Sequence, residues 1–349
     1  MIASESSHFR NFHIPYIEYL QRHNTLVYTA SNGEFEKDGV VHTKLNFKKK
    51  ITSISNIGVI VKLARLIRRE RFDAVYTNST LAGAAGRAAA ILSGVGKTKC
   101  IHICHGYLFS DDGSVRSKLY LAAEKLFRKR TEILAVMNRE DLEIARKYSL
   151  GKETVFLNGM GFDPRKFPEI SEQEISYKRK ELGGGNGETL FLCVGEFSRR
   201  KNQTDVIKAC AKLKRTDYRV IFAGDGVMLE ECKKLSEALG LSDKIKFHGH
   251  CTNINLLYRS CDYLVSASRS EGLPFNVMEA LFCGENIIVS AVKGNIDLVG
   301  KNARSYPFGD IERLSELMED AQCPSVSDGL PPKYLLEHTL AENISRLQF

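Results

Sequence analysis

No apolar stretch of this 349-residue sequence approaches the roughly 20 residues that a membrane-spanning helix requires. The opening Met1–Glu5 lacks the basic start and the apolar core of a secretory signal peptide. The nine cysteines stand singly, and an odd number without paired spacing argues against a disulfide framework and favours reduced thiols. With 43% apolar and 26% charged residues, the composition is that of a globular protein, and we expect it to work in the cytoplasm.

Motifs of several enzyme classes are missing as well. There is no Gly-x-Ser-x-Gly nucleophile elbow, and Gly94–Thr98 resembles only the tail of a phosphate-binding Walker loop. The stretch His248-Gly249-His250-Cys251 offers metal-ligand types, but a fourth ligand has no obvious source and alternate residues of a strand face opposite ways. No Asp-x-Asp pair is available to hold a divalent ion against a diphosphate. We therefore expect no metal and no other cofactor.

The formal net charge of +8 fits an anionic ligand, an anionic membrane or a nucleic acid about equally well. Nucleic acid is disfavoured, because no aromatic-basic interleaving and no known binding module is present. Basic residues cluster at 48–50, 65–71 and 125–130. Residues 57–72 predict a helix with an apolar stripe opposite a basic one, Val59, Ile60, Leu63, Leu66 and Ile67 against Lys62, Arg65, Arg68 and Arg69. Such a helix either packs on its own domain or contacts an anionic membrane surface.

Short β-branched runs alternate with helical patterns in both halves of the chain, which predicts parallel α/β sheets. Predicted strands are Leu26–Thr29, Ala74–Thr77, Cys100–Cys104, Ile133–Val136, Thr154–Leu157, Leu190–Val194, Arg219–Phe222, Lys244–Phe247, Tyr263–Ser266 and Ile287–Ser290. Predicted helices are Phe12–Gln21, Ile57–Arg69, Ala82–Leu92, Lys118–Phe127, Asp141–Tyr148, Gln203–Leu213, Leu229–Leu239, Phe275–Phe282, Ile311–Met318 and Tyr334–Leu347.

The length suits two domains better than one core. We expect two Rossmann-like domains, residues 1–165 and 166–330, whose sheets face one another across a cleft. The joint is expected between Asn158–Gly161 and the flexible glycine cluster Gly183–Gly187, which also fits a loop before the first strand of the second domain. Residues 331–349 are expected to form a C-terminal helix that returns toward the first domain.

Glu271 and Glu279 stand eight residues apart around the predicted start of a helix. Pro274 suits the first helical position and Gly284 the C-terminal cap. Backbone N–H groups near Phe275 and Asn276 would then form an anion site between the two carboxylates. A ligand with both hydroxyls and phosphate, such as a nucleotide-sugar, suits that combination.

Other candidate residues follow predicted strands, where ligands of open α/β sheets bind. Val194–Asn202 joins a tight turn at Gly195 to three consecutive cations, Arg199, Arg200 and Lys201, before a helix. Cations are unfavourable at that end of a helix unless an anion is bound there, so a diphosphate clamp is the preferred interpretation over a solvated basic loop. Ala223–Gly226, which contains Gly224 and Asp225, and His105-Gly106 follow two other strands, although each also fits an ordinary structural role.

Taken together, these residues resemble the family 4 retaining glycosyltransferases of the GT-B fold, in the branch that builds capsular polysaccharide or exopolysaccharide. Glu271–Leu281 resembles the Glu-x7-Glu motif of that family. It is supported by Gly195–Lys201, Ala223–Gly226, His105-Gly106, Asn158–Asp163 and the N-terminal Phe12–Ile17. The first strand of the domain, which begins at Met1, is short relative to the family, so we expect the start of the sequence to be clipped.

The resemblance implies a role for each matching residue. Glu271 would hold donor-sugar hydroxyls and support the developing oxocarbenium charge, and His105 would lie near the transferred sugar as the second catalytic residue. Lys201 would contact the diphosphate and Glu279 the ribose. Where many members carry arginine this chain has Glu196, so Arg199 or Arg200 would supply the missing charge. The remaining donor-binding candidates are Gly195, Gly224, Asp225, Gly272, Leu273, Pro274, Phe275 and Asn276.

The resemblance further implies transfer of a hexose or N-acetylhexosamine, with UDP as the expected nucleotide, to a lipid-linked saccharide at the inner face of the cell membrane. Two alternatives stay open. A nucleotide-sugar epimerase of the same fold would form product without an acceptor. A non-catalytic accessory subunit would bind the nucleotide-sugar and leave it intact.

Overall fold

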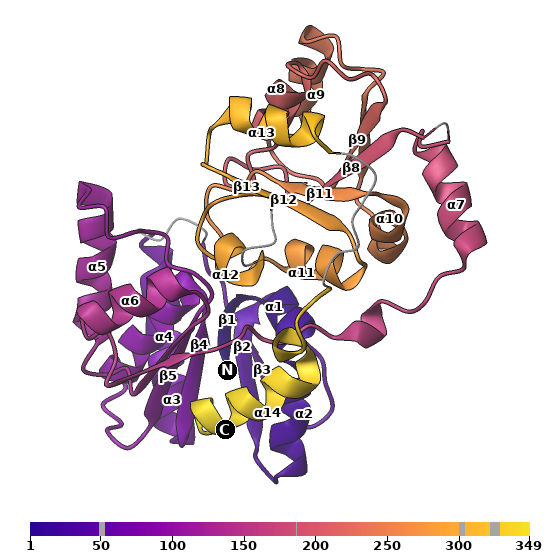
Figure 1. Cartoon of the computed structure of the whole chain (residues 1–349). Coiled ribbons are helices and arrows are strands. Elements are labelled where there is room, and N and C mark those ends of the chain that lie inside the picture. The colour runs from indigo at the N-terminus through magenta and orange to yellow at the C-terminus, as the bar shows by residue number, and fades with distance from the viewer. Residues whose placement is uncertain (49–52, 186, 300–303, 322–328) are drawn as a thin grey trace. The chain divides into compact units, whose positions relative to one another are not determined.

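The computed structural model describes residues 1–48, 53–185, 187–299, 304–321 and 329–349. It divides into two compact units, Met1–Gly161 with Leu336–Phe349, and Phe162–Leu335 (Figure 1). The boundaries expected from the sequence, 165/166 and 330/331, lie a few residues away from these. Lys49 and Lys50 of the first basic cluster, Asn186 of the glycine cluster and residues 322–328 lie outside the described residues.

The first unit is built on a seven-stranded parallel sheet with the strand order β3-β2-β1-β4-β5-β6-β7. Its strands are β1 (Ile2–Glu5), β2 (Val27–Asn32), β3 (Val40–Lys44), β4 (Ala74–Asn78), β5 (Lys99–Cys104), β6 (Ile133–Val136) and β7 (Glu153–Phe156). Its helices are α1 (Ser6–Phe12), α2 (Ile14–Arg22), α3 (Ser55–Glu70), α4 (Thr80–Leu92), α5 (Val115–Phe127), α6 (Arg139–Lys147) and the C-terminal α14 (Leu336–Leu347). One apolar cluster joins the sheet to α3 and α4, and another joins it to α1 and α2.

The second unit has a six-stranded parallel sheet with the order β10-β9-β8-β11-β12-β13. Its strands are β8 (Thr189–Val194), β9 (Tyr218–Ala223), β10 (Ile245–Gly249), β11 (Tyr263–Ser266), β12 (Asn286–Ser290) and β13 (Arg304–Tyr306). Its helices are α7 (Glu172–Glu181), α8 (Gln203–Cys210), α9 (Leu229–Ala238), α10 (Ile254–Ser260), α11 (Phe275–Phe282), α12 (Asn295–Val299) and α13 (Ile311–Glu319), with short 3₁₀ turns at Pro164–Lys166 and Pro332–Tyr334.

The residues of β8 show that this sheet is covered by helices on both faces. Phe191 and Cys193 pack with α8 and α13, whereas Leu190 and Leu192 pack with α10 and α11. Successive side chains of a strand point to opposite faces, so a strand buried on both sides reads as one continuous apolar run. The predicted class, two Rossmann-like domains with parallel sheets, is confirmed.

The sequence prediction located the long elements and missed several short ones. Strands Ile133–Val136 and Tyr263–Ser266 and helix Phe275–Phe282 have the predicted bounds. The helices α1, α7, α10 and α12 and the strands β3 and β13 were not predicted. β3 is only partly buried and β13 has three residues, so neither carries the apolar run that marks a buried strand.

The C-terminal helix α14 belongs to the first unit. The amide Nδ2 of Asn343 donates to Tyr16 Oη at 2.7 Å and to the Gly159 carbonyl oxygen at 2.8 Å. The ring of Phe349 stacks on Tyr76 with 4.3 Å between centroids. The chain therefore passes between the units twice, at 161–162 and again at 335–336.

Helix α3 packs on its own domain, which was the simpler of its two predicted interpretations. Val59, Leu63 and Ile67 are buried against the sheet and α4. The Arg68 guanidinium donates to the carbonyl oxygens of Leu92 and Ser93 at the end of α4. The buried residues of this stripe are therefore not available to a membrane, whereas Ile60 and Leu66 are half-buried. Among the described residues, no helix combines the length and apolar character needed to cross a bilayer.

Candidate active site

Glu271 lies between two cations of the loop that follows β8. Its Oε2 is 2.7 Å from Arg200 Nη1, and its Oε1 is 2.8 Å from Lys201 Nζ. The Glu271 side chain is 8% exposed and that of Lys201 12% exposed, whereas Arg200 reaches it from solvent. The structure thus brings together three of the predicted residues, and it is Arg200, not Arg199, that pairs with the carboxylate.

The electrostatics of this cluster keep Glu271 ionised. Burial acts to raise the pKa of Glu271, but the charges of Lys201 and Arg200 and the hydrogen bonds to the carboxylate outweigh burial, and the net pKa is lowered. With two cations and one carboxylate, the Arg200–Lys201–Glu271 cluster has a net charge of +1. The cluster therefore retains attraction for an anion even with Glu271 charged.

Close backbone contact explains the glycines of the two neighbouring loops. Gly195 and Gly224 have φ of +146° and +144°, conformations that side-chain-bearing residues rarely adopt. A Cβ on Gly224 would lie 2.2 Å from the carbonyl oxygen of Gly195. The Phe197 N–H also donates to the Asp225 carbonyl oxygen at 2.8 Å. These contacts hold the two loops together beneath the site, while the Asp225 side chain is exposed.

A pocket of about 430 Å³ opens at the carboxyl ends of β8, β9 and β10. Its lining includes the predicted Gly195, Gly224, Asp225 and Glu279. His250, Cys251 and Ile254 also line it, and of these the sequence singled out only His250 and Cys251, as metal-ligand types and not as donor-binding residues. The volume suits a small-molecule ligand.

Glu279 has a different environment from Glu271. Its Oε2 accepts a hydrogen bond of 2.8 Å from the hydroxyl of Tyr258 on α10. Burial raises the pKa of Glu279 to about 7, and the Tyr258 hydrogen bond and the charges of Lys201 and Lys166 only partly oppose that rise. The two acidic side chains of the motif are therefore in different states near neutral pH, one ionised and one close to half-protonated.

The helix start between them differs slightly from the prediction. Pro274 is the N-cap of α11 and not its first helical residue, which is Phe275. Gly284 follows the C-cap with φ of +84°, as predicted for a helix end. The Asn276 side chain, which is buried, donates to the Val194 carbonyl oxygen at 3.1 Å and so ties α11 to the end of β8. Gly272 and Leu273 are partly buried in the connection that leads to the helix.

His105 lies in the first unit, directly after β5, where the sequence placed it. Its Nε2 is 3.4 Å from Asn78 Oδ1 at the end of β4. Burial and the neighbouring His8 and His102 hold the pKa of His105 well below its usual range, so the ring is neutral at pH 7.

Two parts of the site were not predicted from the sequence. Tyr258 lies on α10, a helix that was not predicted, and it becomes a hydrogen-bond partner of Glu279 only through the folding of the second unit. Gly294 has φ of +79°, and a Cβ there would lie 2.8 Å from the Glu271 carbonyl oxygen. The Gly294 turn in the sequence was a usable signal, because a glycine after a strand end indicates close backbone approach. Within the described ranges, ligand atoms of three or more histidine, cysteine or acidic residues converge at His8, His13 and His105 and not at His248–Cys251.

Comparison with known proteins identifies the family. Residues 22–159 match the model described as glycosyl transferase 4-like domain, and residues 175–322 match the model of glycosyl transferases group 1. The first match lies in the first unit and the second in the unit that holds Glu271. The chain is a family 4 glycosyltransferase of the GT-B fold.

Curated relatives extend over much of this glycosyltransferase. It is 27% identical over 332 residues to the putative glycosyltransferase EpsD of Bacillus subtilis, covering 91% of this chain and 85% of that protein. It is 29% identical to the UDP-Gal:α-D-GlcNAc-diphosphoundecaprenol α-1,3-galactosyltransferase of Escherichia coli, covering 72% of this chain and 66% of that protein.

Solved structures share the fold at lower sequence identity. A glycosyltransferase from Rickettsia africae has a TM-score of 0.77 at 17% identity, covering 100% of this chain and 96% of that one. HepE of Anabaena, solved with UDP and glucose, has a TM-score of 0.71 at 18% identity, covering 95% and 90%.

Proposed function

We propose that this glycosyltransferase moves a hexose or N-acetylhexosamine from a UDP-sugar to a lipid-linked saccharide in surface polysaccharide synthesis. The observation that carries the proposal is the buried Glu271 held between Lys201 and Arg200, with the Lys201 side chain close to Gly195, which lines the pocket of about 430 Å³. The name of the Escherichia coli relative, a UDP-Gal transferase to a diphosphoundecaprenol acceptor, supports the donor and acceptor classes. The UDP complex of HepE supports the nucleotide.

The cluster has the charges that cleavage of a sugar–phosphate bond needs. That reaction leaves an anionic nucleotide and a cationic sugar ring. Lys201 and Arg200 would take the diphosphate charge, and Glu271, released from them, would face the developing positive charge on the sugar. Arg200 would thereby supply the cation that many members carry as an arginine at the position of Glu196. Because side chains and the start of α11 provide the positive charge, the reaction would need no metal.

We further propose that transfer retains the anomeric configuration. None of these residues is an obvious covalent nucleophile for the sugar, so the acceptor hydroxyl would attack from the face of the leaving group, assisted by a phosphate oxygen. His105 would lie near the transferred sugar as a neutral hydrogen-bonding group.

A transfer assay tests the proposal and separates it from the alternatives. The full chain is incubated with UDP-hexoses and UDP-N-acetylhexosamines, with and without a diphosphoundecaprenol-linked saccharide. We expect a new glycolipid only when the acceptor is present. Product from donor alone would indicate an epimerase, and donor binding without turnover in either case would indicate an accessory subunit.

Nucleotide binding should depend on pH through Glu279. An ionised carboxylate accepts hydrogen bonds from ribose hydroxyls more strongly than a carboxylic acid does, and a pKa of about 7 places the change near neutrality. The affinity for UDP is expected to rise about fivefold from about pH 6 to about pH 8. Calorimetric titration measures it, and Glu279→Gln is the matched control because ionisation of the UDP phosphate affects both proteins alike. Equal pH responses in the two proteins would contradict this role.

A lipid-linked acceptor requires an approach to a membrane, and α5 offers a surface for it. Val115, Leu119 and Leu126 lie on one face of this helix and are 75%, 67% and 73% exposed. The exposed Lys118 and Lys129 flank them. Apolar side chains bordered by lysines are typical of helices that lie in the interface of an anionic bilayer.

The opposite face of α5 is fixed to the first unit. Glu124 forms two hydrogen bonds, of 2.7 and 2.8 Å, with the buried Arg87 guanidinium of α4. That guanidinium also lies 4.8 Å from the centre of the Phe127 ring. Since these contacts account for the inner face, the exposed leucines are not needed for folding of the unit.

Leu119→Glu combined with Leu126→Glu is expected to weaken binding to vesicles of anionic lipid at least tenfold, because two apolar anchors are lost and two like charges approach the lipid. Vesicle co-sedimentation measures the change. The control is Ile91→Glu on α4, which alters another apolar residue of the same unit, 51% exposed. Equal binding of the double variant and the wild type would rule out α5 as the membrane contact.

A further inference from the structure

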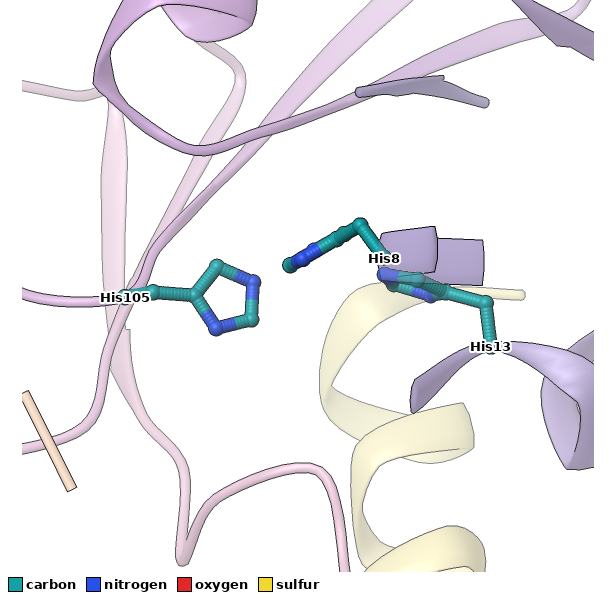
Figure 2. Close-up of side chains that lie close together, drawn as sticks. All are labelled: His8, His13 and His105. Atoms are coloured by element: carbon teal, nitrogen blue, oxygen red, sulfur yellow. The ribbon is translucent and has the colours of Figure 1, made fainter. Parts of the chain in front are cut away.

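Three histidines from separate segments converge in the first unit (Figure 2). His8 belongs to α1, His13 to the turn between α1 and α2, and His105 to the residue after β5. One ring nitrogen of each lies within 4.8 Å of those of the other two. The rings of His8 and His105 meet edge to face at 4.7 Å between centroids.

The hydrogen-bonding capacity of this cluster is not used up. His13 is 1% exposed, and neither of its ring nitrogens forms a hydrogen bond of good geometry among the described residues, although the Asn78 side chain lies close to all three rings. Nε2 of His8 is also buried and without a partner there. Buried polar atoms are nearly always paired, so ring nitrogens that converge on one point with only a single amide nearby are available to bind a ligand.

The donor set defines the class of that ligand. Imidazole nitrogen suits Zn²⁺ and its neighbours among the transition metals, and three histidines with an open fourth position are a common catalytic zinc arrangement. Metal binds the neutral ring, and burial lowers the pKa of all three histidines, that of His8 to about 4. Zinc–nitrogen bonds of about 2.0 Å require nitrogens roughly 3.4 Å apart, so the rings, whose nitrogens lie within 4.8 Å of one another, would move closer when a metal binds.

We propose that His8, His13 and His105 form a transition-metal site that binds Zn²⁺, with the fourth position open to water. Metal binding would occupy His105 and add positive charge beside it. If His105 lies near the transferred sugar, as the proposed function has it, bound Zn²⁺ opposes the developing positive charge on the ring and inhibits transfer. The site itself does not depend on that role.

Metal titration of the full chain after chelator treatment tests the site. Calorimetry with Zn²⁺ is expected to give one binding event that His8→Ala and His105→Ala each weaken at least tenfold, since even outer-shell changes cost ten- to hundredfold. His23→Ala, at an exposed histidine of α2's end, is the matched control and should bind as the wild type does. His8 and His105 are partly exposed, so their variants are expected to fold.

Co²⁺ absorption identifies the ligands and excludes the cysteines as the source of binding. Nitrogen ligation gives d–d bands without thiolate charge transfer, and these bands should disappear in His8→Ala. Thiolate bands, or Zn²⁺ affinity unchanged in both histidine variants, would overturn the site. Zinc inhibition of transfer that His8→Ala relieves would support the link to catalysis. Histidine-dependent Zn²⁺ binding without inhibition would retain the site and reject the proposed position of His105 near the sugar.

Discussion

Glu271→Gln is expected to lower kcat for sugar transfer by about a hundred- to a thousandfold, the range seen when one preorganised electrostatic contact to a transition state is removed. The amide keeps the shape of the side chain and loses the charge that would face the oxocarbenium-like sugar. Lys201 and Arg200 are unchanged in this variant, so the affinity for UDP is expected to stay within a few-fold of the wild type. Initial rates at saturating donor, with UDP binding measured by calorimetry, separate the two effects.

The matched control is Glu285→Gln, which makes the same change at another buried carboxyl group. Glu285 is 3% exposed, and neither of its oxygens has a hydrogen-bond partner within the described ranges. Burial and the nearby Asp262 raise the pKa of Glu285 well above its ordinary value, so the folded protein holds it neutral and an amide mimics it. Its kcat should not change. More than about a tenth of wild-type kcat in Glu271→Gln would contradict the proposed role.

Lys201→Ala is expected to weaken donor binding by at least thirtyfold and to lower kcat/KM by more. Removing one member of a buried charge pair costs about 2 kcal/mol or more, and about 1.4 kcal/mol corresponds to a factor of ten in affinity. The Lys201 ammonium lies 2.8 Å from Glu271 in the unliganded protein, and its loss leaves Arg200 as the partner of that carboxylate. Calorimetry with the UDP-sugar and steady-state kinetics measure both quantities.

Three further substitutions make this result specific. Lys208→Ala removes an exposed lysine on α8, seven residues along the chain, and should leave donor binding unchanged. Arg200→Ala should weaken binding more than Arg199→Ala, because Arg200 is the arginine paired with Glu271. An equal effect of Lys201→Ala and Lys208→Ala would show that general charge, not the clamp, attracts the donor.

The α/β class and the Glu271–Glu279 segment were predictable because both depend on local patterns. A strand buried on both faces needs a continuous apolar run, as in Leu190–Val194, and proline is favoured near a helix start, here Pro274, which lies one residue before the position predicted for it in the helix. The basic loop and the Glu271 segment were both predicted to lie at strand ends, where ligands of such sheets bind, and the ion pairs show that Arg200 and Lys201 lie against Glu271.

Helices α3 and α5 show where local pattern is insufficient. Both are amphipathic and basic, and the sequence pointed to α3 as the membrane candidate. The fold buries Val59, Leu63 and Ile67 of α3 and leaves Leu119 and Leu126 of α5 in solvent. Periodicity shows that a helix has an apolar face, but only the neighbouring elements decide whether that face is covered.

The sequence by itself determined the parallel α/β architecture, the two acidic residues of the motif and the basic loop, because short-range periodicity and turn chemistry encode them. Only the tertiary structure decided that Tyr258 donates a hydrogen bond to Glu279 and that Arg200, not Arg199, pairs with Glu271. It also decided that His105 lies close to His8 and His13. These partners come from separate helices, strands and loops. Their distances depend on how the elements pack, and no local pattern records that packing.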